Sequence, residues 1–240
     1  MRELRAVMED CIPRDHSRQM LTADYIRRLL RDHHDVRRVM DLGCGSGRSL
    51  DTFRAVRPRI EWVGLDIADS PEARSRKRTD GRFCTFDGVR VPFADGAFDF
   101  VYSAQVFEHV RDPQPLAAEI RRVLRPGGWL AGSVAQMEAY HSYSVWNFTP
   151  YGFRMLLENA GLRLLEVRPG MDAVTLLARR LLGRPRFFDR WWARESPLNR
   201  LISVGGAIRR ASPASINAAK LLAAGSFGFL ATRPEQAERR

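Results

Sequence analysis

The sequence is poor in cysteine and has no long apolar run. Cys11, Cys44 and Cys84 are the only cysteines among 240 residues, which argues against a disulfide framework and is typical of reduced thiols in a cytoplasm. The longest apolar candidates, such as Leu221–Thr232, fall short of the ~20 residues that a membrane-spanning helix needs. Early charges without a following apolar stretch predict no signal peptide. Metal-ligand spacings are also missing, so we expect no metal requirement.

Lysine is also scarce, and basic residues outnumber acidic ones. Lys77 and Lys220 are the only lysines among 39 basic residues, and the formal net charge is +11. This charge favours anionic partners such as phosphates, acidic lipids, nucleic acid or acidic sugars. Nucleic acid is the unlikely partner of these, because the chain has no zinc-ligand spacing, no RNA-binding aromatic signature and no dense basic run. The length and the 45% hydrophobic content suit one large α/β domain.

The stretch around which the chain is organised is Val39–Arg48, which reads V-M-D-L-G-C-G-S-G-R. Gly43, Gly45 and Gly47 occupy every second position between a short apolar run and a helical segment that begins at Ser49. This pattern predicts a strand, a tight turn and a helix N-terminus. Glycines permit positive φ and let a ligand lie against bare backbone. We expect a nucleotide-like or amino-acid-like ligand here; a ligand-free close crossing of strand and helix is the alternative.

A second apolar run, Glu61–Ile67, also carries an acid near its end. Asp66 lies 19 residues beyond Gly47, where a carboxylate at the tip of the neighbouring strand can accept two hydrogen bonds from a ribose diol. A dinucleotide dehydrogenase would need the same acid. Its loop usually reads G-x-G-x-x-G, however, whereas the spacing here is G-x-G-x-G.

Four segments in the same order resemble class I S-adenosylmethionine-dependent methyltransferases, over about Val39 to Pro169. Asp41–Gly47 resembles their first motif, and Asp66 their ribose-binding acid. Phe86–Gly88 with the following V-P-F-A-D-G-A-F-D resembles their next two motifs, and L-R-P-G-G-W-L at 124–130 their entry into the fifth strand. The resemblance implies a Rossmann-like α/β fold: a seven-stranded, mostly parallel sheet with an antiparallel last strand and helices on both faces.

The resemblance also implies S-adenosyl-L-methionine as the cofactor and S-adenosyl-L-homocysteine as the product. The residues expected to bind this cofactor lie in the glycine loop, at the tip of the second strand, and after the third and fourth strands. They are Asp41, Gly43, Cys44, Gly45, Gly47, Asp66, Ile67, Asp87, Gly88 and Gln105. In that loop Cys44 is expected to act as a small spacer rather than as a nucleophile. The resemblance implies that Asp87 accepts a hydrogen bond from the adenine amino group and that Gly88 flanks the ring; the alternative for Asp87 is a turn aspartate that bonds its own loop.

The segment Ala135–Thr149 follows the expected fifth strand on the catalytic edge. Its aromatic residues alternate with hydrogen-bonding groups, which suits a ring-bearing or sugar-like acceptor; an amphipathic lid on the sheet is the alternative. An oxygen nucleophile gains from a nearby base. His141 is the first candidate for this catalytic role, His109 the second and Glu138 the third.

We expect a single methyltransferase domain over residues 1–240. It comprises an N-terminal helical segment (1–35), a cofactor-binding core (36–170), a helical insertion (171–225) before the last strand, and that final strand (226–234). Ser17 is expected to cap a helix over Arg18–His33. Further helices are each expected to begin at a short polar residue followed by proline: Ser70, Asp112, Thr149 and Ser212. The run Arg74–Arg78 is read as a solvated face, and Arg125–Gly128 as a turn before a fifth strand, Trp129–Val134.

The helical insertion is rich in arginine and aromatic residues. Residues 179–210 interleave arginines with Phe187, Phe188, Trp191 and Trp192, a mixture found in interfacial membrane helices. Peripheral contact with the inner face of a membrane is one interpretation of this mixture; a substrate cap or a homodimer contact is favoured over it.

The main functional prediction is O-methylation of a small-molecule, sugar or lipid-linked glycan acceptor. The alternatives are C- or N-methylation of a quinone-like or amine metabolite, a non-catalytic cofactor-binding partner subunit, and, least favoured, a dehydrogenase. The variable acceptor loops of one sequence do not identify the acceptor.

Overall fold

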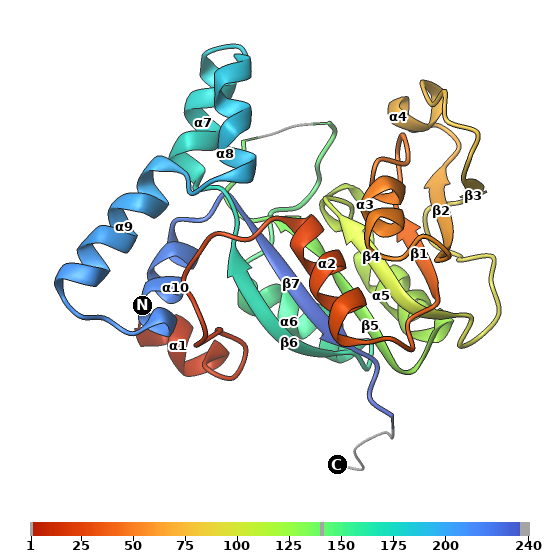
Figure 1. Ribbon diagram of the computed structural model, residues 1–240, viewed down its shortest axis with the longest axis horizontal. Helices are drawn as coiled ribbons and strands as arrows, with labels where there is room; N and C mark the ends of the chain where they lie inside the picture. Colours follow the sequence, from red (N-terminus) through yellow and green to blue (C-terminus); the bar gives the residue numbers. More distant parts are fainter. Residues whose placement is uncertain (1, 140–141, 236–240) are drawn as a thin grey trace.

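The computed structural model describes residues 2–139 and 142–235. Its centre is a sheet with the strand order β3-β2-β1-β4-β5-β7-β6 (Figure 1). Every pairing is parallel except the two that involve β7. The strands are β1 (Arg38–Leu42), β2 (Glu61–Ile67), β3 (Arg82–Phe86), β4 (Phe98–Ala104), β5 (Leu124–Ala135), β6 (Arg163–Pro169) and β7 (Ser226–Thr232). The expected sheet, with an antiparallel last strand between the fifth and sixth, is confirmed.

Helices cover both faces of this sheet. One face carries α1 (Arg2–Met8), α5 (Pro113–Val123), α6 (Pro150–Asn159) and α10 (Pro213–Leu222). The other carries α2 (Thr22–Asp32) and α3 (Ser49–Val56). The remaining helices are α4 (Pro71–Arg74), η1 (Phe107–His109), α7 (Ala173–Leu181), η2 (Arg186–Asp189), α8 (Arg190–Ala193) and α9 (Pro197–Ile208).

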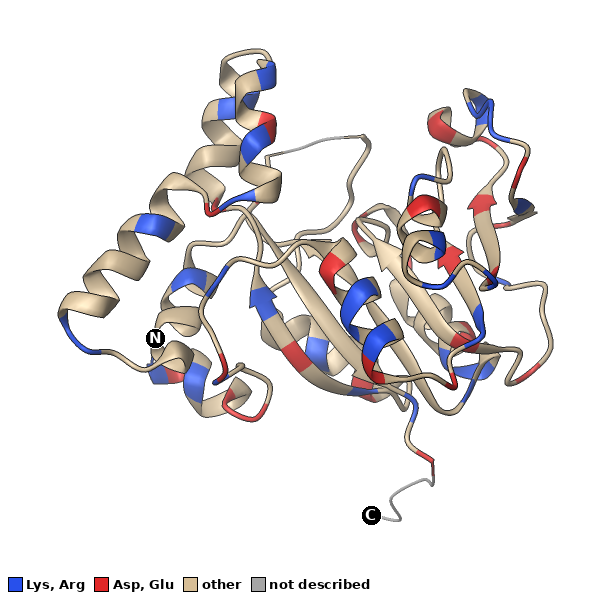
Figure 2. Cartoon of the chain, viewed as in Figure 1, with Lys and Arg blue, Asp and Glu red and all other residues tan. Residues whose placement is uncertain are grey.

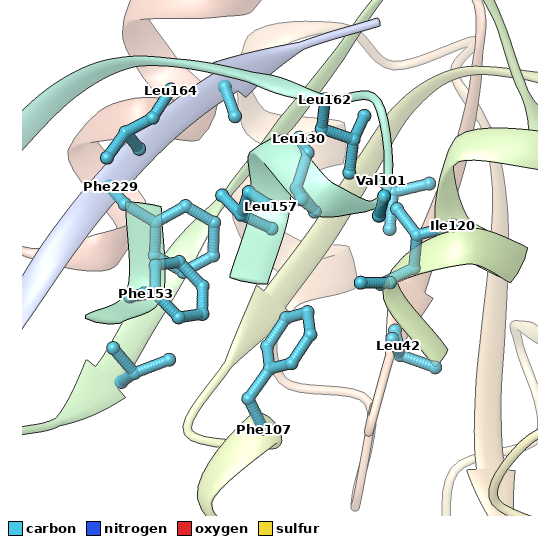
Figure 3. Close-up of a cluster of buried hydrophobic side chains, with 14 of the residues drawn as sticks. Leu42, Val101, Phe107, Ile120, Leu130, Phe153, Leu157, Leu162, Leu164 and Phe229 are labelled. Carbon is cyan, nitrogen blue, oxygen red and sulfur yellow. The ribbon is translucent and has the colours of Figure 1, made fainter. Parts of the chain in front are cut away.

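The larger core lies between the sheet and α5 and α6. Figure 3 shows Phe107, Phe153 and Phe229 from three separate elements, gathered beside Leu157 and Leu130. The Phe107 and Phe153 rings form a T-shaped pair with centroids 5.3 Å apart, and the Phe153 and Phe229 centroids are 4.6 Å apart. This packing fixes η1, and therefore the loop that follows β4, against the sheet.

Short polar residues begin several helices as the sequence predicts. Ser70, Asp112, Thr149 and Ser212 each accept a main-chain hydrogen bond from the first turn and are followed by proline. Proline suits this turn because its missing N–H would have no helical partner.

The prediction that Ser17 caps a helix over Arg18–His33 is wrong. Helix α2 begins at Thr22. The preceding residues are bonded elsewhere: Lys220 Nζ donates to the Ser17 carbonyl at 2.5 Å, and Asn199 Nδ2 donates to Gln19 Oε1 at 2.8 Å. These contacts with the insertion replace the helical hydrogen bonds that local sequence favours.

The fifth strand is longer than predicted. Arg125–Gly128, which was expected to form a turn, belongs to β5, and the pairing of β5 with β4 shifts register between Phe98 and Phe100. Glycine is required in this strand at Gly132, because an added Cβ would lie 1.6 Å from the Ser103 carbonyl oxygen.

Candidate functional site

The β1–α3 turn has an unusual backbone. Gly43, Gly45 and Gly47 have φ values of +68°, +50° and +79°, a region that L-residues rarely adopt. A Cβ on Gly43 would lie 2.4 Å from Val106 Cγ2, and one on Gly47 would lie 2.9 Å from Phe83 Cζ. The turn therefore needs glycine both for its conformation and for its close contacts.

Asp66 joins the tip of β2 to this turn. Its carboxylate is 7% exposed; Oδ2 accepts from Gly45 N at 2.6 Å and Oδ1 accepts from Ile67 N at 2.8 Å. A carboxylate has about four acceptor sites, so each oxygen retains capacity for one hydroxyl of a ribose diol. Asp66 thus fits the expected role and also orients the turn.

Asp41 lies beneath the turn. It is buried, and Ser49 Oγ donates to its Oδ2 at 2.5 Å. Burial raises the pKa of Asp41 to about 7, and the charge of nearby Asp66 adds to this effect. In this structure Asp41 holds the first turn of α3, which supports the loop from below.

Two arginines from the segment after α4 contact the turn. Arg76 Nε donates to the Gly45 carbonyl at 2.8 Å, and Arg78 Nη1 donates to the Gly47 carbonyl at 2.6 Å. Arg76 also stacks over Phe83, 4.0 Å from its centroid. The interpretation of Arg74–Arg78 as a solvated face is wrong for these two residues, because α4 ends at Arg74 and the chain then folds back over the loop.

Cys44 is buried in the same turn. Burial raises the pKa of its thiol to about 12, and the Sγ lies 2.7 Å from where a Gly64 Cβ would be. A protonated, enclosed thiol is a poor nucleophile, so this environment supports the spacer interpretation.

The ends of β2 and β3 form the wall expected to hold an adenine ring. Ile67 is exposed, and its Cγ2 lies 3.6 Å from the Cβ position of Gly88, which has a φ of +90°. Asp87 Oδ1 accepts from Val89 N at 2.9 Å and Arg90 N at 2.6 Å, and these hydrogen bonds lower the pKa of Asp87. Asp87 therefore shapes its own turn, while its adenine contact remains a prediction.

A polar cluster lies where β4 and β5 end. Gln105 has a φ of +57°, a strained conformation of the kind that collects at functional sites. With its amide oriented so that the oxygen accepts from Ser133 Oγ, the nitrogen donates to Glu108 Oε1 at 2.9 Å and Glu138 Oε2 at 3.1 Å. The topology thus brings Gln105 to a pair of carboxyl groups.

Glu108 is the member of this cluster that the sequence did not single out. It is fully buried, and its Oε2 has no hydrogen-bond partner in the described structure. Burial raises the pKa of Glu108 to about 8, and nearby Glu138 contributes to this rise. The raised pKa favours the protonated, neutral form of this buried carboxyl group. A Q-V-F-E-H string gives no local signal for such burial.

The other base candidates have different outcomes. His109 is the last residue of η1, and its main-chain N–H donates to the Val106 carbonyl at 2.9 Å. His141 lies outside the described residues. In the acceptor segment Tyr143 is 81% exposed, whereas Phe148 packs on Phe153 at 5.5 Å and belongs to the core.

Within residues 2–139 and 142–235, no three His, Cys, Asp or Glu side chains form a group that could hold a metal ion. None of the helices in that same part of the chain combines the length and apolarity needed to cross a bilayer.

Comparison with known proteins shows that part of the chain is similar to methyltransferases. Residues 40–132 match the family model described as "Methyltransferase domain". A methyltransferase of Mycobacterium sp. (strain KMS) is 38% identical over 118 residues, which cover 48% of this chain and 42% of that protein. A Thermus thermophilus demethylmenaquinone methyltransferase is 35% identical over 99 residues, covering 39% of this chain and 45% of that one. The matched segments thus span less than half the length of these relatives.

A solved structure shares the fold over most of the chain. It is Burkholderia thailandensis 1,6-didemethyltoxoflavin-N1-methyltransferase with its substrate and S-adenosylhomocysteine bound. The TM-score is 0.54 at 16% identity, covering 89% of this chain and 78% of that one. The fold is the Rossmann-like fold of class I S-adenosylmethionine-dependent methyltransferases. Within it, residues 40–132 are the part that matches the methyltransferase-domain model.

Proposed function

We propose that this chain transfers a methyl group from S-adenosylmethionine to a hydroxyl oxygen of a small-molecule, sugar or lipid-linked glycan acceptor, in the cytoplasm at the inner face of a membrane. The observation that carries the cofactor assignment is the left-handed glycine turn tied to Asp66 through Gly45 N. The positions without side chains at Gly43 and Gly45, a diol acceptor at Asp66 and an apolar wall at Ile67 and Gly88 fit this cofactor.

The cofactor supplies an activated methyl group whose bond to sulfur breaks as a bond to the acceptor oxygen forms, leaving a thioether. The protein aligns the two reactants and excludes water. Asp66 would hold the ribose. The acceptor hydroxyl loses its proton to a base, for which we favour His141, then His109 and Glu138. In support of this, Gln105, which follows β4, donates a hydrogen bond to Glu138 of the expected acceptor segment, which follows β5.

The test is transfer of labelled methyl from S-adenosylmethionine to a panel of sugars, lipid-linked glycans, quinols and amines. Asp66→Ala should abolish cofactor binding. His141→Ala should lower turnover by roughly 10²–10⁴-fold with nearly unchanged cofactor affinity; the exposed His34→Ala is the matched control. Weakened cofactor binding or unchanged turnover in His141→Ala would exclude the base role.

A second candidate is C-methylation of a quinone-like acceptor. It is favoured by the similarity to the demethylmenaquinone methyltransferase. Label in quinols but not in hydroxylated sugars would select it, and label in amines would select N-methylation. Cofactor binding without transfer to any acceptor would favour the non-catalytic partner subunit.

A further inference from the structure

The helical insertion leaves the sheet at the edge that carries the candidate site. Helix α7 follows the C-terminal end of β6, which runs parallel to β5, and α10 leads back into β7 (Figure 1). The insertion also contacts the acceptor segment: Arg180 Nη2 donates to the Ala139 carbonyl at 3.3 Å, and Gln136 N donates to the Gly225 carbonyl at 2.8 Å. Whatever α7–α9 bind is therefore held beside the acceptor loop.

The outer part of the insertion carries a strong positive charge. Seven arginines lie between residues 184 and 210, and all are exposed. Figure 2 shows basic positions in blue along the outer helices of the insertion. The two acids of this stretch are neutralised elsewhere: Asp189 pairs with Arg179 at 2.9 Å, and Glu195 pairs with Lys220 at 2.5 Å. None of the seven arginines has a carboxylate within 4.0 Å among the residues that the structure describes. The surface thus presents seven cations without internal counterions.

Aliphatic side chains lie among these cations. Helix α9 packs on α10 through Gly206, where a Cβ would approach Ile216 Cγ1 to 2.6 Å. Its other side carries Leu201, Val204 and Ile208, spaced for one helix face, with Leu201 68% and Ile208 79% exposed. Helix α7 repeats this arrangement with Val174, Leu177 and Leu181, the last 77% exposed. Such exposed apolar stripes mark interaction surfaces.

We propose that α7–α9 form a peripheral docking surface for a bilayer that contains anionic lipid. Unpaired arginines match the negative headgroups, and the aliphatic stripes enter the acyl boundary. A two-fold dimer through this face would bring the same unpaired arginines together, and nucleic-acid phosphates would leave the aliphatic stripes in water. The inference extends the proposed function by assigning the face that meets the membrane, but the docking does not require methyl transfer.

This assignment sets the orientation of the site. The docked insertion would place the exposed Tyr143, Val145 and Trp146 on the membrane side of the acceptor segment. A lipid-linked acceptor could then reach the cofactor edge without leaving the bilayer.

The direct test is vesicle flotation of the full chain without cofactor or acceptor. Vesicles of phosphatidylcholine alone are compared with vesicles that also contain phosphatidylglycerol, over a salt series. We expect binding only to the second kind, and a fall in binding with salt. The measurement is independent of turnover, so failure of the docking surface and failure of the proposed reaction can be distinguished.

Matched variants separate charge from apolar contact. The triple variant Arg184→Ala, Arg190→Ala and Arg209→Ala should lower the partition coefficient roughly 100-fold, since each basic residue near such a surface contributes about fivefold. The variant with lysine at the same three positions keeps the charge and should bind vesicles nearly as well as wild type. A control pair, Arg37→Ala and Arg59→Ala, removes exposed arginines at the opposite sheet edge and should change nothing.

A separate variant tests the contribution of the aliphatic stripes to bilayer binding. Leu181→Ser, Leu201→Ser and Ile208→Ser together should lower partitioning by at least roughly tenfold, because the lost apolar burial no longer favours the bilayer. Circular dichroism checks that these exposed substitutions leave the fold intact. Absent binding to anionic vesicles, or equal binding by the arginine triple and wild type, would overturn the proposal. So would a stable dimer that the aliphatic variant dissociates.

Discussion

Glu108→Gln isolates the energetic cost of a buried carboxyl group in the candidate site. Glu108 is fully buried, and its pKa is raised from the usual 4.5 to about 8. The pKa of Glu108 is higher in the folded state than in the unfolded state, so below pH 4.5 this residue does not lower the stability of the fold. Between pH 4.5 and pH 8 the unfolded state gains by ionising while the folded state keeps the proton, so stability falls as the pH rises.

The size of this loss follows from the shift. Each pH unit in the window costs about 1.4 kcal/mol, so Glu108 lowers the free energy of unfolding by about 3 kcal/mol at pH 7. Glutamine keeps the size and the Oε1 acceptor for Gln105 but cannot ionise. The variant should therefore match wild type near pH 4.5 and become progressively more stable than wild type up to about pH 8.

The assay is denaturant unfolding of both proteins across this pH range. Asp41, whose pKa is raised to about 7, contributes equally to both curves, so their difference isolates Glu108. The exposed Glu3→Gln is the control and should change stability by less than about 0.5 kcal/mol at every pH. Parallel curves for wild type and Glu108→Gln would refute the assignment of a buried neutral carboxyl.

Other substitutions test the loop and the core. Gly43→Ala should weaken cofactor binding and lower stability by about 1–3 kcal/mol, because of the φ of +68° and the clash of the added Cβ with Val106. Gly183→Ala is the control: its φ is +77° but the space around it is open, so only the conformational cost should remain. Equal stability losses in the two variants would contradict a role for the Val106 contact. Arg168→Met removes the buried ion-pair partner of Glu166 and Asp15. Thermal unfolding should show that the free energy of unfolding falls by about 2–4 kcal/mol, a loss limited by Arg28, which remains paired with Glu166. An unchanged melting temperature would contradict this. Cys44→Ala should retain methyl transfer in the labelled assay, and loss of turnover with intact cofactor binding would revive the nucleophile role.

The sheet could be predicted because its signals are local and agree with one another. Apolar runs ending in acids gave β1 and β2, and proline after a capping residue gave the starts of α4, α5 and α6. The glycine loop was predicted for the same reason, since alternate glycines have few structural uses other than left-handed turns.

Long-range contacts explain what the sequence could not predict. Arg76 and Arg78 reach the loop carbonyls only because the chain reverses after α4. The extended segment before α2 depends on side chains from α9 and α10, nearly 200 residues away. Burial of Glu108 depends on the packing of η1 against α6 through Phe107 and Phe153. None of these contacts leaves a spacing pattern in the chain.

Calorimetric titration of the purified chain with S-adenosylmethionine, S-adenosylhomocysteine and NAD tests the central claim most directly. The account predicts one site for the first two ligands, tighter for the demethylated product, no heat with NAD, and loss of the site in Asp66→Ala. Binding of NAD, or binding of S-adenosylmethionine that is unchanged in Asp66→Ala, would contradict it.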